Sequence, residues 1–164
     1  MLLKEDIIFD SDNNSRIKLR FINSGDIELL RKWKNDNKQY FFFDKIINPD
    51  QQLEWYRNFS KRENDFMFIV ELDTKRIGCM GFRQINKTID IYNVILGEKQ
   101  YSQQKVMSNA FQLMISNIKE KFALEIFAKV LKSNPALRWY LKNGFRVSGK
   151  KDKYFLIKME NSKK

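Results

Sequence analysis

Apolar and polar residues follow one another with two periods along this chain, one typical of strands and the other of amphipathic helices. Residues 17–21, IKLRF, alternate apolar and charged side chains, which predicts a half-buried strand. Residues 23–25 then predict a turn, and Asp26 is the predicted cap of a first helix that runs to about Asn37. The apolar positions of this helix fall on one face: Ile27, Leu29, Leu30 and Trp33.

A second helix is predicted from Asn48 and Pro49 onward, because proline is favoured in the first turn of a helix. Between the two helices, residues 40–43, YFFF, form an aromatic run in a predicted loop. Four adjacent aromatic side chains in a loop cannot all face one core, so we expect some of them to line a pocket. The apolar stripe of the second helix is expected to consist of Leu53, Trp55, Tyr56 and Phe59.

The rest of the chain consists of apolar runs broken by short polar segments. Lys75 and Arg76 mark a hairpin, and residues 97–105 form a polar connection. Asn134 and Pro135 are expected to open a short helix that ends at Gly144. The other predicted elements are strands at 66–72, 77–82, 89–96, 123–130, 145–147 and 154–159, and a helix at about 106–122.

Strands and helices are thus mixed along the chain, without an internal repeat or a linker long enough to divide it. Residues 1–164 are therefore predicted to form one domain, an α/β or α+β layer sandwich. The apolar content of 43% is ample for a single core and excludes a disordered tail protein. The single cysteine, Cys79, cannot form an intramolecular disulfide, and residues 1–12 are too charged for a signal peptide, so we expect a cytoplasmic protein.

The formal net charge is +11, which favours anionic ligands such as nucleotides, coenzyme A or nucleic acid. An AT-rich genome that encodes many lysines is the alternative explanation. The sequence contains no histidine, which excludes an imidazole base, nucleophile or metal ligand, and one cysteine alone argues against a zinc site. No apolar run approaches the roughly 20 residues needed to span a bilayer.

Residues 134–145, NPALRWYLKNGF, together with this order of elements, resemble the last conserved block of the GCN5-related N-acetyltransferase (GNAT) superfamily. An Asn, an Ala, a Tyr and a Gly-Phe pair recur there at this spacing. The resemblance covers residues 17–159. It implies a GNAT-like fold, in which a mixed, mostly antiparallel twisted sheet of about six to seven strands is flanked by about four helices.

The resemblance also implies acetyl-CoA as co-substrate, with no metal. In the family, a loop written QxxGxG or QxxGxA cradles the pyrophosphate of coenzyme A with its backbone N–H groups. Here residues 101–110 read YSQQKVMSNA and contain no glycine, although Lys105 offers a charge to phosphate. The implied cofactor-binding residues are Gln103, Gln104, Lys105, Val106 and Met107 in this segment, Val94, Ile95 and Leu96 on the preceding strand, and Asn134, for which simple helix capping is the alternative.

Tyr140 matches the family tyrosine that protonates the departing thiolate, and a packed aromatic side chain is the alternative. Asp90 and Glu98 are candidates for the base that deprotonates the acceptor amine, although each is more often a solvated charge. Tyr92 and Asn93 are candidates to orient the acceptor. Cys79 is expected to be a small core residue, because the chain has no histidine that could generate a thiolate.

The branch that the chain looks closest to acetylates ribosomal protein N-termini, antibiotics and nucleotide-linked amino sugars. Two segments carry this similarity, RKWKND at residues 31–36 and PDQQLEWY at residues 49–56. A histidine often found near the start of the second helix in amino-sugar acetyltransferases is replaced here by Gln51 and Gln52, so its role is not carried over. Tyr40, Phe41 and Phe42 are candidates to line the acceptor pocket and stack on a nucleobase, with Lys38 or Lys45 meeting a diphosphate; a core plug or a dimer contact is the alternative.

We therefore expect a bacterial N-acetyltransferase that acts on a primary amine, preferably an amino sugar on a nucleotide carrier. A protein N-terminus or an antibiotic is an alternative acceptor, and an acyl carrier protein is an alternative donor. From another class, a non-catalytic GNAT-like binding module would explain the glycine-free loop. Nucleic acid is not an expected partner, since no helix-turn-helix or RNP-type signature is present, and a homodimer is suggested by family habit alone.

Overall fold

The computed structural model describes residues 16–161, which form a seven-stranded sheet in the order β1-β2-β3-β4-β5-β7-β6. Neighbouring strands are antiparallel except β4 and β5, which are parallel. The strands are β1 (Ile17–Phe21), β2 (Asp65–Leu72), β3 (Lys75–Ile85), β4 (Thr88–Leu96), β5 (Glu125–Leu131), β6 (Phe145–Lys150) and β7 (Tyr154–Met159). The predicted strands are confirmed, and β3 and β6 extend beyond their predicted ends.

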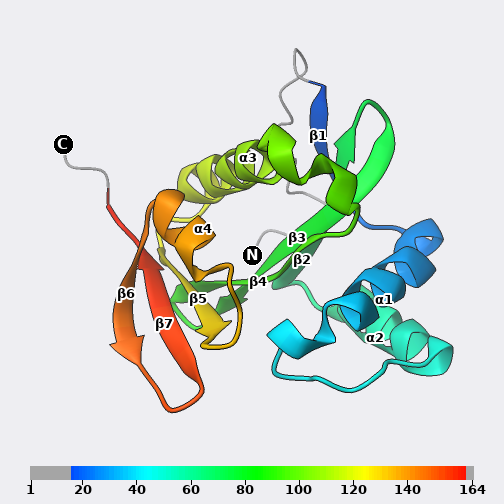
Figure 1. The fold of residues 1–164 in the computed structure, drawn as a ribbon, viewed down its shortest axis with the longest axis horizontal. Helices are drawn as coiled ribbons and strands as arrows, with labels where there is room; N and C mark the ends of the chain where they lie inside the picture. The colour runs from blue at the N-terminus through cyan, green and yellow to red at the C-terminus, as the bar shows by residue number, and fades with distance from the viewer. Residues whose placement is uncertain (1–15, 162–164) are drawn as a thin grey trace.

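Helices cover both faces of this sheet (Figure 1). The α-helices are α1 (Ile27–Asp36), α2 (Pro49–Lys61), α3 (Val106–Lys121) and α4 (Leu137–Lys142), and short 3-10 helices are η2 (Ser24–Asp26), η3 (Lys38–Tyr40) and η4 (Lys99–Gln104). Helices α3 and α4 contribute to one hydrophobic cluster, and α1 and α2 contribute to a second one. The result is a layered α/β domain of the predicted class.

Strand β2 shows why an unbroken apolar run is required at the centre of this fold. Phe66, Phe68 and Val70 belong to the cluster under α3 and α4, whereas Met67 and Ile69 belong to the cluster under α1 and α2. Successive side chains of a strand point to opposite faces, so a strand covered on both sides must be apolar at every position. All five side chains are essentially inaccessible to solvent.

The second helix starts at Asn48 and Pro49 as predicted, whereas the predicted cap of the first helix by Asp26 is wrong. Asn48 and Gln51 form a capping box at the start of α2, in which each side chain accepts from the other residue's backbone N–H at 2.8 Å. Asp26 holds the N-cap position of α1 but makes no side-chain cap there. Instead, its buried carboxylate accepts from the backbone N–H of Asn23 and pairs with Arg20.

Two other local predictions were wrong. Leu53 was expected in the apolar stripe of α2 but is 37% exposed, while Gln52 on the same helix is buried. Asn134 does not cap α4 directly, because α4 begins at Leu137 with Ala136 as its N-cap. The Asn134 side chain instead accepts from the backbone N–H of Ala136 at 2.9 Å, which fixes the turn before the helix.

Candidate active site

A cavity of about 1120 Å³ opens where β4 and β5 separate. Residues 88–91 of β4 pair with residues 125–128 of β5, and beyond this point the two parallel strands are no longer paired. On its other side β4 stays paired with β3, through a register shift beside Asn93, which adopts a left-handed backbone with φ 51°. The sheet is thus held together on one side of β4 and open on the other.

The open edge of β4 forms one wall of the cavity. Val94, Ile95 and Leu96, the three predicted residues of this strand, all line it. Beyond Ile91 the edge that faces β5 has no strand partner among the described residues. Backbone N–H and C=O groups at such an edge can bind an extended, amide-containing ligand as an added strand would be bound.

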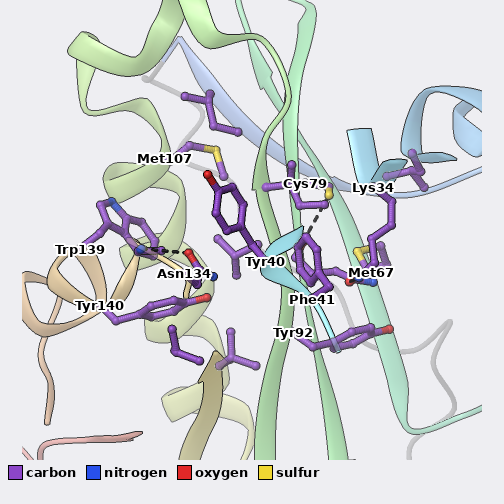
Figure 2. Close-up of a pocket in the computed structure, with 18 of the residues that line it drawn as sticks. Lys34, Tyr40, Phe41, Met67, Cys79, Tyr92, Met107, Asn134, Trp139 and Tyr140 are labelled. Carbon is purple, nitrogen blue, oxygen red and sulfur yellow. Dashed lines mark hydrogen bonds between the residues drawn. The ribbon is translucent and has the colours of Figure 1, made fainter. Parts of the chain in front are cut away.

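The N-terminus of α3 forms the upper end of the cavity in the orientation of Figure 2, where Met107 is labelled. Lys105, the residue before this helix, adopts a left-handed backbone with φ 55° and makes no side-chain cap. Glycine adopts this conformation without strain, so a lysine here takes the shape that a glycine would supply. The first N–H groups of α3 have no intrahelical acceptors, and together with the Lys105 ammonium they form an anion-binding position.

Of the five residues predicted in this loop, three line the cavity and two do not. Lys105, Val106 and Met107 line the cavity. Gln103 and Gln104 lie on η4, are exposed, and are not among the described residues that line the cavity. The tight 3-10 turn directs these two positions outward.

Tyr140 lies on α4 and lines the cavity near Asn134 (Figure 2). Its ring is buried and meets Phe111, Trp139 and Phe145 edge-on, with centroids 5.9, 5.0 and 5.7 Å away. Burial, and in second place the charge of Asp90, raise the pKa of the Tyr140 hydroxyl above its usual value. This hydroxyl therefore keeps its proton at neutral pH and can donate a hydrogen bond to a ligand in the cavity.

Tyr92 and Asp90, on β4, are held in a network of charges. The Tyr92 hydroxyl donates to the buried Asp65 carboxylate, and the Arg83 guanidinium lies 4.2 Å from the Tyr92 ring centroid. Arg83 also donates to Asp90 at 2.9 Å. Burial and the Asp65 carboxylate raise the pKa of Tyr92, so its phenol stays protonated.

Glu98, the other predicted base candidate, lies outside this wall. It follows the end of β4 and accepts a hydrogen bond of 3.4 Å from Nε1 of the buried Trp33. It is not among the described residues that line the cavity. Of the two carboxylates, the structure brings only Asp90 to the cavity, and there it is engaged by Arg83.

Lys34 was not predicted as a site residue, although it lies in the RKWKND segment. It projects from α1 into the cavity, where its Nζ donates to Asn93 Oδ1 and lies 3.5 Å from the centroid of the Phe41 ring. Burial lowers the pKa of this ammonium to about 8, and the nearby Arg83 charge acts in the same direction. A partly buried lysine whose pKa is lowered in this way is a candidate functional residue.

The aromatic run at residues 40–43, called here the aromatic strap, crosses the cavity. All four side chains line it, Phe42 and Phe43 being 58% and 50% exposed. Figure 2 shows Tyr40 between Met107 and Asn134, and Phe41 between Tyr140 and Lys34. The expectation that some of these rings line a pocket is confirmed, whereas Lys38 and Lys45 are not among the described lining residues.

Cys79 is buried on β3, and its thiol donates to the backbone carbonyl of Asn93 at 3.3 Å. Burial raises the pKa of this thiol to about 12, so it is not a nucleophile near neutral pH. Among the described residues, no cluster of three or more acidic, histidine or cysteine side chains is placed to bind a metal ion. In residues 16–161 no helix is both long and apolar enough to cross a bilayer.

Several further residues line the cavity without having been predicted. Arg83 lies on β3 and Lys129 on β5, and a charged side chain within a strand of a sheet covered on both faces is a signal that could have pointed to them. Trp139 donates to Ser108 Oγ at 2.9 Å and so joins α4 to the start of α3. Others that the sequence did not single out are Trp55, Met67, Lys142 and Asn143.

Comparison with known proteins adds a family to this geometry. The model of a family described as "Acetyltransferase (GNAT) domain" matches residues 16–146. By sequence, the chain is 26% identical over 151 residues to Acetyltransferase PseH of Campylobacter jejuni. This alignment covers 86% of the chain and 90% of PseH.

Solved structures share the fold. The crystal structure of PseH superposes with a TM-score of 0.67 at 23% identity, covering 89% of this chain and 99% of that one. FdhC, described as a nucleotide-linked sugar GNAT, superposes with a TM-score of 0.74 at 21% identity. The superposition covers 87% of this chain and 85% of FdhC. PaiA N-acetyltransferase from Thermoplasma acidophilum, solved in complex with coenzyme A, superposes with a TM-score of 0.66 at 19% identity. The superposition covers 88% of this chain and 99% of PaiA.

Proposed function

The chain belongs to the GNAT acetyltransferase family, and from this premise we propose that its acceptor is the amino group of a sugar carried by a nucleotide. The enzyme is an N-acetyltransferase that takes its acetyl group from acetyl-CoA. The alternative of a non-catalytic module rested on the glycine-free loop. That basis is weakened, because Lys105 adopts the left-handed backbone that a glycine would supply.

The described residues fit acetyl-CoA. The open edge of β4 at Val94, Ile95 and Leu96 is suited to the two amides of the pantetheine arm. The N-terminus of α3, preceded by Lys105, is suited to the pyrophosphate. Bound there, acetyl-CoA supplies a thioester whose carbonyl carbon is open to attack by an amine.

In the proposed reaction the acceptor nitrogen attacks this carbon, so that a C–N bond forms and the C–S bond breaks. Tyr140 donates its hydroxyl proton to the leaving sulfur, a role supported by its position in the cavity, and the N–H proton that the acceptor nitrogen loses as the amide forms restores the phenol through solvent. Backbone N–H groups at the β4 edge are placed to stabilise the negative charge on the thioester oxygen. The protein contributes alignment and proton transfer, with no covalent intermediate on its own side chains.

The charge of the cavity is the observation that carries the choice of acceptor. Five cationic side chains line it, and Asp90 is the single carboxylate among the described lining residues. Such a field favours an amine attached to an anionic carrier and disfavours a free polyamine. The cationic lining residues are Lys34, Arg83, Lys105, Lys129 and Lys142.

The aromatic strap supports a nucleotide carrier for a second reason. Phe42 and Phe43 are half exposed at the cavity, and an exposed ring is a surface on which a nucleobase can stack. FdhC, a structure of the same fold described as a nucleotide-linked sugar GNAT, points in the same direction. Function in a bacterial cytoplasm, and a homodimer, remain predictions.

A panel of acceptors tests this proposal by the rate at which free coenzyme A thiol is released. We expect kcat/KM for a UDP- or dTDP-linked amino sugar to exceed that for the same free amino sugar, for spermidine and for an N-terminal peptide by on the order of 100-fold. The acetylated product is identified by mass spectrometry. Equal rates with the free sugar would remove the nucleotide from the proposal, and a preference for spermidine would contradict it.

A further inference from the structure

Transfer to an amine requires a group that removes a proton from the acceptor, since an ammonium has no lone pair with which to attack. The candidates among the described residues that line the cavity can be compared by their contacts. Asp90 is bound by Arg83, the phenol of Tyr92 donates to Asp65, and the Cys79 thiol donates to a backbone carbonyl. Each of these groups is already committed to a partner inside the protein.

Lys34 differs from these groups in its surroundings. No carboxylate of the described residues lies within ion-pair distance of its ammonium, in contrast to Lys32 on the same helix, which pairs with Asp36 at 2.8 Å. Asn93 Oδ1 and the face of the Phe41 ring take two of the three directions in which Nζ can form a bond. The third is available to a ligand in the cavity that Nζ lines.

Burial and the Arg83 guanidinium favour the neutral form of Lys34, whereas Cys79, the Asn93 oxygen that accepts from Nζ and the face of the Phe41 ring favour its ammonium form. From β3 it faces the protonated thiol of Cys79 and the guanidinium of Arg83, from β4 the amide of Asn93, and from the aromatic strap Phe41. None of these is an anion. Burial lowers the pKa of Lys34 to about 8, so that about a tenth of it is unprotonated at pH 7 and about half at pH 8.

We propose that Lys34 is the general base of the acetyl transfer: its Nζ lone pair accepts a proton from the acceptor ammonium, whose nitrogen then attacks the thioester. An N–H bond of the acceptor breaks, an N–H bond on Nζ forms, and the proton is later released to solvent. Asn93 acts as a positioning residue through its hydrogen bond to Nζ. The assignment rests on the proposed function and adds to it the residue that activates the acceptor.

The placement of Lys34 relative to Tyr140 suits a base and an acid in one reaction. Figure 2 shows the two side chains reaching into the cavity from opposite sides, Lys34 from α1 and Tyr140 from α4. The Phe41 ring lies between them and covers Nζ. The acceptor can therefore reach Nζ from the direction that neither Asn93 nor Phe41 occupies.

Lys34→Arg is the decisive substitution, because arginine keeps the positive charge and the hydrogen bonds but cannot act as a base near neutral pH. We expect kcat to fall on the order of 100-fold or more, with the KM of the acceptor and the Kd of acetyl-CoA changed by less than about threefold. Lys32→Arg, on the exposed face of α1, is the matched control and should leave all three constants unchanged. A Lys34→Arg enzyme with wild-type kcat would show that Lys34 only binds an anion and would overturn the proposal.

The pH profile adds a readout that a structural role would not move. For the wild-type enzyme we expect log kcat to rise with pH and to level off above about pH 8, and this limb should be absent in Lys34→Ala, whose activity methylamine should restore in part. The Lys34 pKa itself is measurable by NMR on protein labelled with 15N-lysine, assigned with the Lys34→Arg variant. This measurement needs no acceptor, so it tests Lys34 even if the proposed acceptor is wrong. A Lys34 pKa near 10.5, the ordinary lysine value, would overturn the proposal.

Discussion

The ring of Phe42 meets the ring of Tyr154 edge-on, with their centroids 5.3 Å apart. Phe42 belongs to the aromatic strap that follows α1 and η3, whereas Tyr154 begins β7, on the far side of the opened sheet. The contact therefore ties the two sides of the cavity together across its mouth. Tyr154 itself is not among the described residues that line the cavity. A substitution of Tyr154 therefore removes the contact without removing a side chain that lines the cavity.

Removing this tie should weaken acceptor binding more than catalysis. We expect Tyr154→Ala to raise the KM of the acceptor by roughly three- to tenfold, since an edge-on aromatic pair contributes about 1 kcal/mol. Phe42→Ala should raise it further, because it also removes a ring on which the nucleobase can stack, and the double variant should cost little more than Phe42→Ala alone. Steady-state kinetics measure this, and fully additive effects on KM would show that the two rings act independently.

Tyr140→Phe removes the hydroxyl and keeps the ring among its aromatic neighbours. We expect kcat to fall on the order of 100-fold while the Kd of acetyl-CoA, measured by calorimetry, stays within about twofold. The wild-type enzyme should also show no loss of activity between pH 7 and about 9, because the raised pKa keeps the phenol protonated. Unchanged turnover in Tyr140→Phe would make this residue a packing residue only.

Lys34→Met should make the protein more stable at neutral pH. The folded-state pKa of Lys34 is lowered from 10.5 to about 8, so below pH 8 the folded protein bears the full cost of a buried charge. Methionine removes this cost, and we expect the free energy of unfolding at pH 7 to increase by on the order of 2 kcal/mol. The gain should shrink as the pH rises from about 8 and vanish above 10.5, where lysine is neutral in both states. Urea denaturation at pH 7 and at pH 10 measures both values, and an equal gain at the two would contradict the lowered pKa.

Gly97→Ala should destabilise the fold, because a Cβ at this position would lie 2.0 Å from the ring of the fully buried Trp33. We expect a loss on the order of 3 kcal/mol in the free energy of unfolding, the cost of overpacking a rigid core. Gly149→Ala is the matched control, since its Cβ would meet Leu156 at an ordinary 3.6 Å. Comparable urea midpoints for the two variants would show that the end of β4 can move away from Trp33.

Much of this fold could be predicted from the sequence, because its elements are recorded in local patterns. The alternation at residues 17–21, the capping box at Asn48 and the double-sided apolar strand at β2 each specify a structure over a few residues. The helix phase of α2 was the exception. Gln52 is buried and Leu53 is exposed, because the face of α2 that carries Gln52 is turned toward the cavity. The positions of the apolar residues alone do not reveal this orientation.

The site was predictable only where a local segment carried it. Residues 134–145 led to Tyr140, and the fourth strand led to Val94, Ile95 and Leu96, all of which line the cavity. Lys34 was missed because its role depends on a contact with Asn93, 59 positions further along the chain. Gln103 and Gln104 were included because spacing alone does not reveal a 3-10 turn that directs them outward.

Everything proposed for this cavity requires that acetyl-CoA binds at the start of α3 despite the missing glycines, and calorimetric titration measures this directly. We expect micromolar binding by the wild-type protein at moderate salt. Lys105→Ala should weaken this binding about tenfold through loss of the phosphate contact, and Lys105→Gly should do the same while keeping the left-handed backbone without strain. Binding that is absent in the wild type, or identical in all three proteins, would contradict this assignment of the cavity.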